Sequence, residues 1–316
     1  MTFDGRLAVV ALSTFALAAS AGSVVAIQAS RGRLRGSPGA QARTLFGLRM
    51  LPVGVGLAAM TQGILSFLVF EPRREQEAVG VLLTVLAATG IALYAVALAR
   101  WVRVTLATNR VVRGWMRTAT PVVVDRMSVP CHAIDARFPV VAVVGIFRRR
   151  LVVARQVLAA CSPAELAAIW AHERWHLTRH DNIRRALMAC LPDPLSMTDA
   201  GERLAARWHE VNELAADDSV GEIGPTGRCD LAAALLNVAR LVPAGSPMTL
   251  LPASALYRGE DVGLRVRRLI GSAAPRPRTR SSRLHRFAIG FAVVVAAGLA
   301  LHGMHEVVEA AVTYLP

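Results

Sequence analysis

Four windows of the chain carry no charged residue, and each is long enough to cross a lipid bilayer. They cover residues 7–30, 50–70, 78–99 and 287–305. A helix needs about 20 apolar residues to span the hydrocarbon core of a membrane. The first window also exceeds the apolar core of a signal peptide, which is about 7–15 residues long. The pattern therefore predicts four membrane-spanning helices, because four buried helices of this kind would need a much larger soluble domain around them.

The arginines between these windows predict which side of the membrane each segment occupies. The 31–43 loop contains four arginines and no acidic residue, whereas the 71–77 loop has more acidic than basic residues. Arginines also cluster in residues 100–117 and 276–286. Because cytoplasmic loops carry the excess of arginine, we expect both termini outside the cell. The 31–43 loop and the long segment between the third and fourth windows are then cytoplasmic.

The predicted fold is mostly α, with a cytoplasmic α+β domain between the third and fourth spans. Residues 1–105 hold the first three membrane helices, residues 106–283 the cytoplasmic domain, and residues 284–316 the fourth helix with a short outer tail. Within the domain, residues 139–145 and 151–154 are rich in valine and bounded by turn residues, which predicts a short hairpin. Its strands either lend an edge to an extended peptide or form an interior pair.

Composition supports this interpretation and narrows the chemistry. Hydrophobic residues make up 54% of the chain and charged residues only 18%, which is unusual for a soluble enzyme. All 36 basic residues are arginine, so mechanisms that need a lysine nucleophile or a P-loop lysine are excluded. The net charge of +14 favours contact with anionic membrane lipid over direct binding of nucleic acid. The four cysteines form no Cys-x-x-Cys pair and are expected to be free thiols in the cytoplasm.

A metal-binding motif lies on a predicted helix in the middle of the cytoplasmic domain. The helix begins with a capping box at residues 162–165 and is expected to continue without interruption to about Leu191. Inside it, His172 and His176 are four residues apart, so both side chains face the same way and can bind one Zn²⁺. Glu173, next to the first histidine, is placed to act as the general base.

A catalytic zinc usually has three protein ligands, so one ligand is still missing. His180 lies one turn further along, but a single straight helix surrounds a tetrahedral ion poorly. A second predicted helix follows a proline-containing loop and carries Glu213 and Asp217, four residues apart on one face. We expect Glu213 to complete the site and Asp217 to accept the ring N–H of a ligand histidine. Glu210 is the rival ligand.

Three other polar residues have two interpretations each. His209, one turn before Glu213, either stabilises an oxyanion or is a structural or surface histidine. Asp181 either makes a hydrogen bond near the metal site or anchors its helix. Arg49, at the inner end of the second window, is expected to extend toward the lipid interface.

The metal motif and its surroundings resemble the BlaR/MecR-type family of membrane metallopeptidases, which place a cytoplasmic zinc domain before a fourth span. Six residues carry the resemblance: His172, Glu173, His176, Asp181, Glu213 and Asp217. The stretch 265–270 fits a late helix of that family. The resemblance implies a gluzincin-like domain with one Zn²⁺ per chain and Glu173 as base. HtpX-type membrane proteases share the motif and remain an alternative.

The predicted function is that of a membrane zinc endopeptidase of the antirepressor type, which cleaves a cytoplasmic protein in response to a signal. The resemblance implies that the substrate is a transcriptional repressor of the winged-helix kind, and a homo-oligomer is compatible with it. Antibiotic-sensing family members carry an extracellular penicillin-binding domain after the fourth span, whereas here about ten residues follow it and the chain has no lysine. The alternative is a membrane sensor or scaffold whose zinc is structural and which signals by conformational change.

Overall fold

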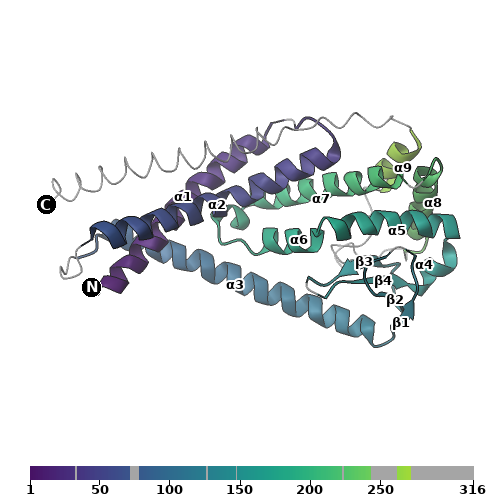
Figure 1. The fold of residues 1–316 in the computed structure, drawn as a ribbon, viewed down its shortest axis with the longest axis horizontal. Coiled ribbons are helices and arrows are strands. Elements are labelled where there is room, and N and C mark those ends of the chain that lie inside the picture. Colours follow the sequence, from purple (N-terminus) through teal and green to yellow (C-terminus); the bar gives the residue numbers. More distant parts are fainter. Residues whose placement is uncertain are drawn as a thin grey trace.

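Three long helices meet at one end of the molecule in a computed structural model of the chain, and the third continues from there toward the other end (Figure 1). They are α1 (Phe3–Ser30), α2 (Pro38–Phe70) and α3 (Val81–Met116). Each is long and apolar enough to cross a membrane. The structure describes residues 1–242, apart from 33, 72–77, 126, 147 and 223, and residues 262–271. The predicted fourth span at 287–305 lies outside the described residues.

Small residues allow the three long helices to approach one another closely. A Cβ atom on Gly22 of α1 would lie 2.9 Å from the Cα of Pro52 in α2. A Cβ atom on Gly90 of α3 would lie 2.7 Å from the carbonyl oxygen of Leu12 in α1. Backbone contacts of this kind are how helices associate where lipid offers no hydrophobic driving force. Helices α1 and α2 therefore pack as one unit, with α3 alongside α1.

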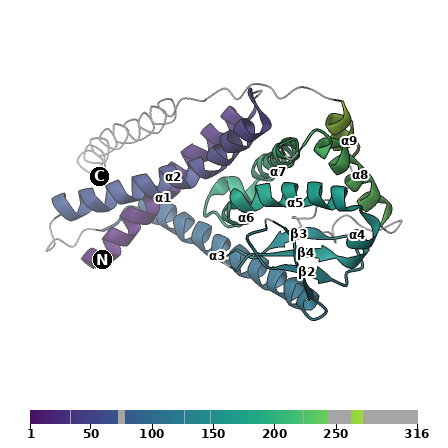
Figure 2. The ribbon, with the colours of Figure 1, turned by 45° about the vertical axis from the view of Figure 1, so that its right-hand side comes forward.

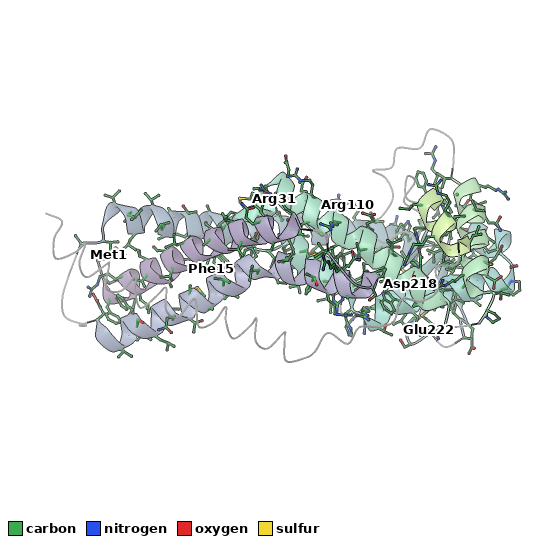
Figure 3. All side chains as sticks on the ribbon, turned by 90° about the horizontal axis from the view of Figure 1, so that it is seen from above. Met1, Phe15, Arg31, Arg110, Asp218 and Glu222 are labelled. Carbon is green, nitrogen blue, oxygen red and sulfur yellow. The ribbon has the colours of Figure 1, made fainter. Side chains whose placement is uncertain are left out.

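Helices α2 and α3 continue well past the predicted spans and reach the rest of the structure. Helix α2 begins at Pro38, before the apolar window that starts at residue 50, and α3 ends at Met116, beyond the window that ends at residue 99. Figure 3 shows the resulting elongated molecule, with Met1 at one end and Asp218 and Glu222 at the other. We call the described residues between 120 and 271 the distal domain.

A four-stranded sheet covers one side of the distal domain. Its strands are β1 (Thr120–Val122), β2 (Cys131–Ile134), β3 (Val141–Val144) and β4 (Arg150–Ala154), in the order β1-β2-β4-β3. Strands β3 and β4 are antiparallel, as the hairpin prediction requires, and β2 runs parallel to β4. Strand β3 lies at one edge of this sheet and β4 lies inside it, so among the described residues β3 is the hairpin strand that pairs with a strand on one side only.

Helices pack on the sheet and against the long helices (Figure 2). Their bounds are as follows: α4 (Arg155–Ala160), α5 (Pro163–Thr178), α6 (Asp181–Ala189), α7 (Asp199–Val220), α8 (Gly227–Arg240) and α9 (Val262–Ile270), with a 3₁₀ turn, η1, at Pro194–Met197. One hydrophobic core joins β2–β4 to α5, α8 and α9. A second core, which includes Trp208 and Leu45, joins α7 to α2. The distal domain is thus packed directly on helices that extend from the apolar bundle.

The prediction of one uninterrupted helix from residue 162 to about Leu191 was wrong. The helix begins as expected with the capping box of Ser162 and Glu165, but it ends at Thr178. His180 then adopts a left-handed conformation, with φ of 56°, and α6 starts at Asp181. A left-handed residue cannot continue a right-handed helix. The sequence offers no glycine or proline at this point, so the break was not visible in it.

Arg49 also differs from expectation. Its side chain is only 2% exposed and forms an ion pair with Asp193, which is completely buried, at 3.0 Å. A long cationic side chain extends to the interface to keep its charged end in water, and a buried carboxylate offers the charge another partner. Here α2 continues into the distal domain, so a carboxylate is within reach.

Gly201 offers a test of how tightly η1 packs on α7. A Cβ atom there would lie 2.0 Å from the carbonyl oxygen of Leu195, a backbone atom. We expect Gly201→Ala to destabilise the protein by about 1–3 kcal/mol, the usual result of overpacking. The control is Gly114→Ala in α3, where no atom lies within 4 Å of the added carbon and the gain in helix propensity should dominate. Thermal unfolding in detergent measures both, and equal midpoints for the two variants would contradict the packing.

Candidate metal centre

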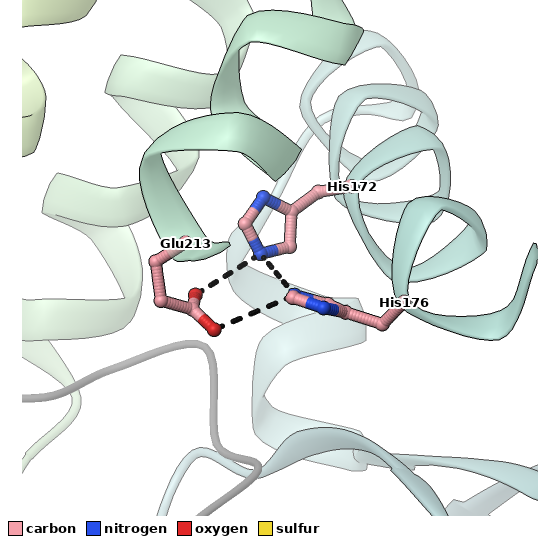
Figure 4. Close-up of side chains that lie close together, drawn as sticks. All are labelled: His172, His176 and Glu213. Atoms are coloured by element: carbon pink, nitrogen blue, oxygen red, sulfur yellow. Dashed lines mark hydrogen bonds and ion pairs between the residues drawn. The ribbon is translucent and has the colours of Figure 1, made fainter. Parts of the chain in front are cut away.

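The structure brings the three predicted metal ligands together between α5 and α7 (Figure 4). The Nε2 atoms of His172 and His176 are 3.2 Å apart. Oxygen Oε2 of Glu213 lies 3.3 Å from Nε2 of His172, and Oε1 lies 3.5 Å from Nε2 of His176. Both histidines are buried, and the Glu213 side chain is 13% exposed. Three donor groups from two helices therefore converge on one point.

The spacing of these donors suits a zinc ion. Zinc–nitrogen and zinc–oxygen bonds of about 2.0–2.1 Å in a tetrahedral site place ligand atoms roughly 3.3 Å apart. The Nδ1 atom of each ring faces a carboxylate, so each ring turns the lone pair of Nε2 toward the other ring and toward Glu213. Three electron-rich atoms at this separation repel one another unless a cation lies between them. The donor set thus fits Zn²⁺, with a fourth position left for other ligands.

Two aspartates hold the ligand rings from behind. Nδ1 of His176 lies 2.8 Å from Oδ2 of Asp181, and Nδ1 of His172 lies 3.1 Å from Oδ1 of Asp217. The amide of Asn212 also donates to Oδ2 of Asp181, at 2.7 Å. Of the two roles left open for Asp181, the structure therefore shows the hydrogen bond next to the metal site. Carboxylates in this position orient a ligand imidazole and raise its basicity.

Arg265 is a residue of this centre to which the sequence assigned no role. Its guanidinium donates twice to the Asp217 carboxylate, at 2.8 and 2.7 Å, and lies 3.6 Å from Oε2 of Glu213. It comes from α9, far along the chain, and is only 4% exposed. One signal was available: Arg265 shares the buried face of α9 with Val262 and Leu269. An arginine at a core position of an amphipathic helix needs a buried acidic partner.

Burial and neighbouring charges shift the pKa values of His172, Glu213 and Asp217 in opposite directions. Burial by itself would raise the pKa of Glu213, but His176, His172 and Arg265 hold that pKa well below its usual range. The pKa of Asp217 is likewise lowered, because Arg265 outweighs the effect of burial. Burial would lower the pKa of His172, yet Asp217 and Glu213 raise it to about 9. Without a metal, this site therefore holds a proton on His172 at neutral pH.

Glu173 lies on α5 between the two histidines and has a different environment. It is 2% exposed, and burial raises its pKa despite the opposing influence of His176 and His172. A carboxylate with a raised pKa is more basic than usual, which suits a group that must accept and release a proton near neutral pH.

Other candidates from the sequence lie outside the donor cluster. Glu210 and His180 are exposed, so neither is placed to complete the site in this arrangement. His209 is buried on α7, one turn before Glu213, but it is not among the three residues whose donor atoms converge. Its role in stabilising an oxyanion stays a prediction.

The raised pKa of His172 makes zinc affinity depend on pH. Zn²⁺ must displace the proton that the metal-free site holds, so apparent affinity rises with pH up to the pKa of about 9. Release of one proton corresponds to about tenfold in affinity per pH unit. A chelator-competition titration of the full-length protein from pH 7 to pH 10 measures this, and the curve should level off above about pH 9. An affinity that does not change between pH 7 and pH 9 would show that His172 carries no such proton.

Comparison with known families agrees with the geometry. Residues 134–243 match the family model described as Peptidase family M48. The match begins in β2, ends just after α8, and includes His172, His176 and Glu213. A search of curated proteins found no match. Peptidases of this family usually use zinc. The chain is therefore a zinc metalloendopeptidase, in which a segment similar to M48 peptidases is combined with apolar helices of the kind that cross membranes.

Proposed function

We propose that this metalloendopeptidase is anchored in the membrane and cleaves a cytoplasmic protein in response to a signal, in the manner of the BlaR/MecR-type antirepressors. The observation that carries the proposal is the direct packing of the peptidase helices on α2. Phe46 of α2 lies 6.4 Å from Trp208 of α7, between ring centroids. Hydrolysis therefore takes place beside helices that reach into the bilayer. The substrate implied by the resemblance is a winged-helix transcriptional repressor.

The residues of the centre have different roles in the proposed hydrolysis. His172, His176 and Glu213 would hold Zn²⁺, which would supply a Lewis acid for activating water and polarising the scissile carbonyl. Glu173 accepts the proton of the attacking water and delivers it to the leaving amine nitrogen. The aspartates behind the two rings keep each imidazole in the tautomer that presents Nε2.

An extended substrate segment is proposed to lie along β3. This strand is at the edge of the sheet, and the helix that carries both ligand histidines packs beside it. Part of the edge is already used, because the amide of Asn182 donates to the carbonyl oxygens of Val143 and Gly145. A peptide that adds to the remaining backbone groups of β3 gains main-chain hydrogen bonds whatever its side chains are.

A second candidate is a quality-control membrane protease of the HtpX type. The match to an M48 family model fits this candidate as well as the first. The two differ in substrate: an antirepressor cleaves one folded regulator, whereas a quality-control enzyme cleaves many damaged membrane proteins. A sensor with a purely structural zinc is the third alternative, and it needs no general base.

Replacing the general base separates an enzyme from a structural zinc site. Glu173→Gln keeps the shape of the side chain and removes its ability to take a proton. We expect zinc content and folding to persist while hydrolysis of a co-expressed repressor falls by roughly 10²–10⁴-fold. The matched control is Glu210→Gln, which alters an exposed glutamate on α7 and should leave cleavage unchanged. Zinc is measured by elemental analysis and cleavage by immunoblot.

Two outcomes would contradict the proposal in different ways. If Glu173→Gln induces the target gene as well as the wild type does, the output of the domain is conformational. If Glu173→Gln stabilises many membrane proteins and no single regulator, the quality-control alternative is favoured.

The orientation of the chain is tested by reporter fusions. The arginines of the 31–43 loop and those of residues 100–117, in the last part of α3, favour a cytoplasmic location for both segments. Fusions at Ser37 and at Gly221 should therefore report the cytoplasm, and a fusion at Pro316 the outside. A signal from outside the cytoplasm at Gly221 would overturn both the orientation and the compartment of the substrate.

A further inference from the structure

All three long helices contact the segment that runs from the last turn of α6 to the residue before α7, which we call the joint (residues 188–198). Arg49 of α2 binds Asp193 and the carbonyl of Met188 within it. Arg100 of α3 donates to the carbonyl of Ser196, at 2.7 Å. Helix α1 also packs against the 3₁₀ turn of the joint. The joint is therefore one place where the apolar bundle is connected to the two helices that follow the zinc motif, in addition to the direct packing of α2 on α7.

Arg49 makes the most buried of these contacts. One nitrogen of its guanidinium donates to Oδ2 of Asp193, and another donates to the carbonyl oxygen of Met188, both at 3.0 Å. Met188 lies in the last turn of α6, where carbonyl groups have no partner within the helix. A cation at this end also interacts favourably with the helix dipole. Arg49 thus caps the C-terminal end of α6 and pairs with Asp193, which lies after α6 in the joint.

Helix α6 connects this contact to the metal centre. It has nine residues, so it is roughly 13 Å long. Its first residue is Asp181, whose carboxylate lies 2.8 Å from Nδ1 of His176. One end of a short helix is therefore held by α2, and the other end holds the ring of a predicted zinc ligand.

Stability alone is a poor explanation for the buried pair. The side chains of Arg49 and Asp193 are 2% and 0% exposed, and the loss of hydration at such a depth offsets most of the attraction between charges. What a buried pair does impose is register, because any shift of α2 against the joint leaves a charge unpaired away from water. The second oxygen of Asp193 accepts from the backbone N–H of Ser196, which fixes the carboxylate in the joint.

We propose that Arg49 and Asp193 form a tie by which α2 positions α6 and, through Asp181, the ring of His176. They are positioning residues for the metal centre, and the tie is where a displacement of α2 in the membrane reaches a zinc ligand. The proposal rests on the metal site of the proposed function. It adds a route through α6 to the direct packing of α2 on α7.

The test uses the full-length protein in detergent and compares two neutralised ion pairs. Arg49→Met with Asp193→Asn removes both charges of the tie and leaves neither unpaired. The control, Arg6→Met with Glu71→Gln, neutralises another pair of a buried arginine and a carboxylate, which joins α1 to α2 away from the joint. The readouts are the dissociation constant for Zn²⁺ and the visible absorption spectrum of the Co²⁺-substituted protein, which reports ligand geometry.

We expect the tie variant to bind Zn²⁺ about tenfold more weakly, within the range for loss of an outer partner of a ligand, and to shift the Co²⁺ spectrum. The control variant should match the wild type in both. In an Asp181→Asn background, neutralising the tie should weaken zinc binding no further, because the route passes through Asp181. An unchanged zinc affinity and spectrum in the tie variant, or fully additive losses in the Asp181 background, would overturn the proposal.

If the double variant fails to fold, Arg49→Lys tests the tie in its place. Lysine keeps a positive charge beside Asp193 but cannot bind it and the Met188 carbonyl with a planar fork. A shifted Co²⁺ spectrum in this variant supports the tie, and a wild-type spectrum overturns it. Failure of the metal site itself is distinguishable, because the unmodified protein would then bind no zinc.

Discussion

The architecture of the centre depends on the contact between each ligand imidazole and a buried carboxylate, a hydrogen bond at His176 and an ion-pair contact at His172. Asp181 and Asp217 each occupy the Nδ1 side of one ring, which turns both Nε2 atoms inward. Each carboxylate is held in turn, Asp181 by Asn212 and Asp217 by the guanidinium of α9. Helices α5, α6, α7 and α9 therefore meet at two imidazole–carboxylate pairs, and the loss of one pair would release a ring from its orientation.

The charge balance of the buried cluster explains why a cation belongs there. Four carboxylates lie close together, those of Glu173, Asp181, Glu213 and Asp217, and in the described part of the chain Arg265 is the buried cation that pairs with two of them. Buried acidic groups in excess are costly unless another positive charge is present. A proton on His172, whose pKa is raised to about 9, supplies that charge when metal is absent. Zn²⁺ supplies it when bound, so proton and metal compete for one place.

The long helices make the distal domain and the apolar bundle one mechanical unit. Helix α2 is continuous from Pro38 to Phe70, so its apolar part and the part that packs on Trp208 cannot move independently without bending. Pro52 lies between the two parts, and proline is the usual site of a helix bend. A signal that tilts the outer part of α2 would thus act on a helix whose inner part contacts both α7 and, through Arg49, the end of α6.

The sequence by itself determined the local features of this protein. Periodicity and charge predicted the three apolar helices now described, the capping box at Ser162, the strand hairpin, and the convergence of His172 and His176 with Glu213. All of these but the Glu213 ligand follow from spacing along one helix or strand, where neighbours in sequence are neighbours in space. Glu213, on a second helix, was predicted because a catalytic zinc usually has a third protein ligand. Tertiary structure decided the rest. The break at His180, the burial of Arg49 against Asp193 and the contact of Arg265 with Asp217 each depend on segments that folding brings together from distant parts of the chain. No local pattern encodes such a partner, because burial and pairing of a charge are properties of the packed molecule.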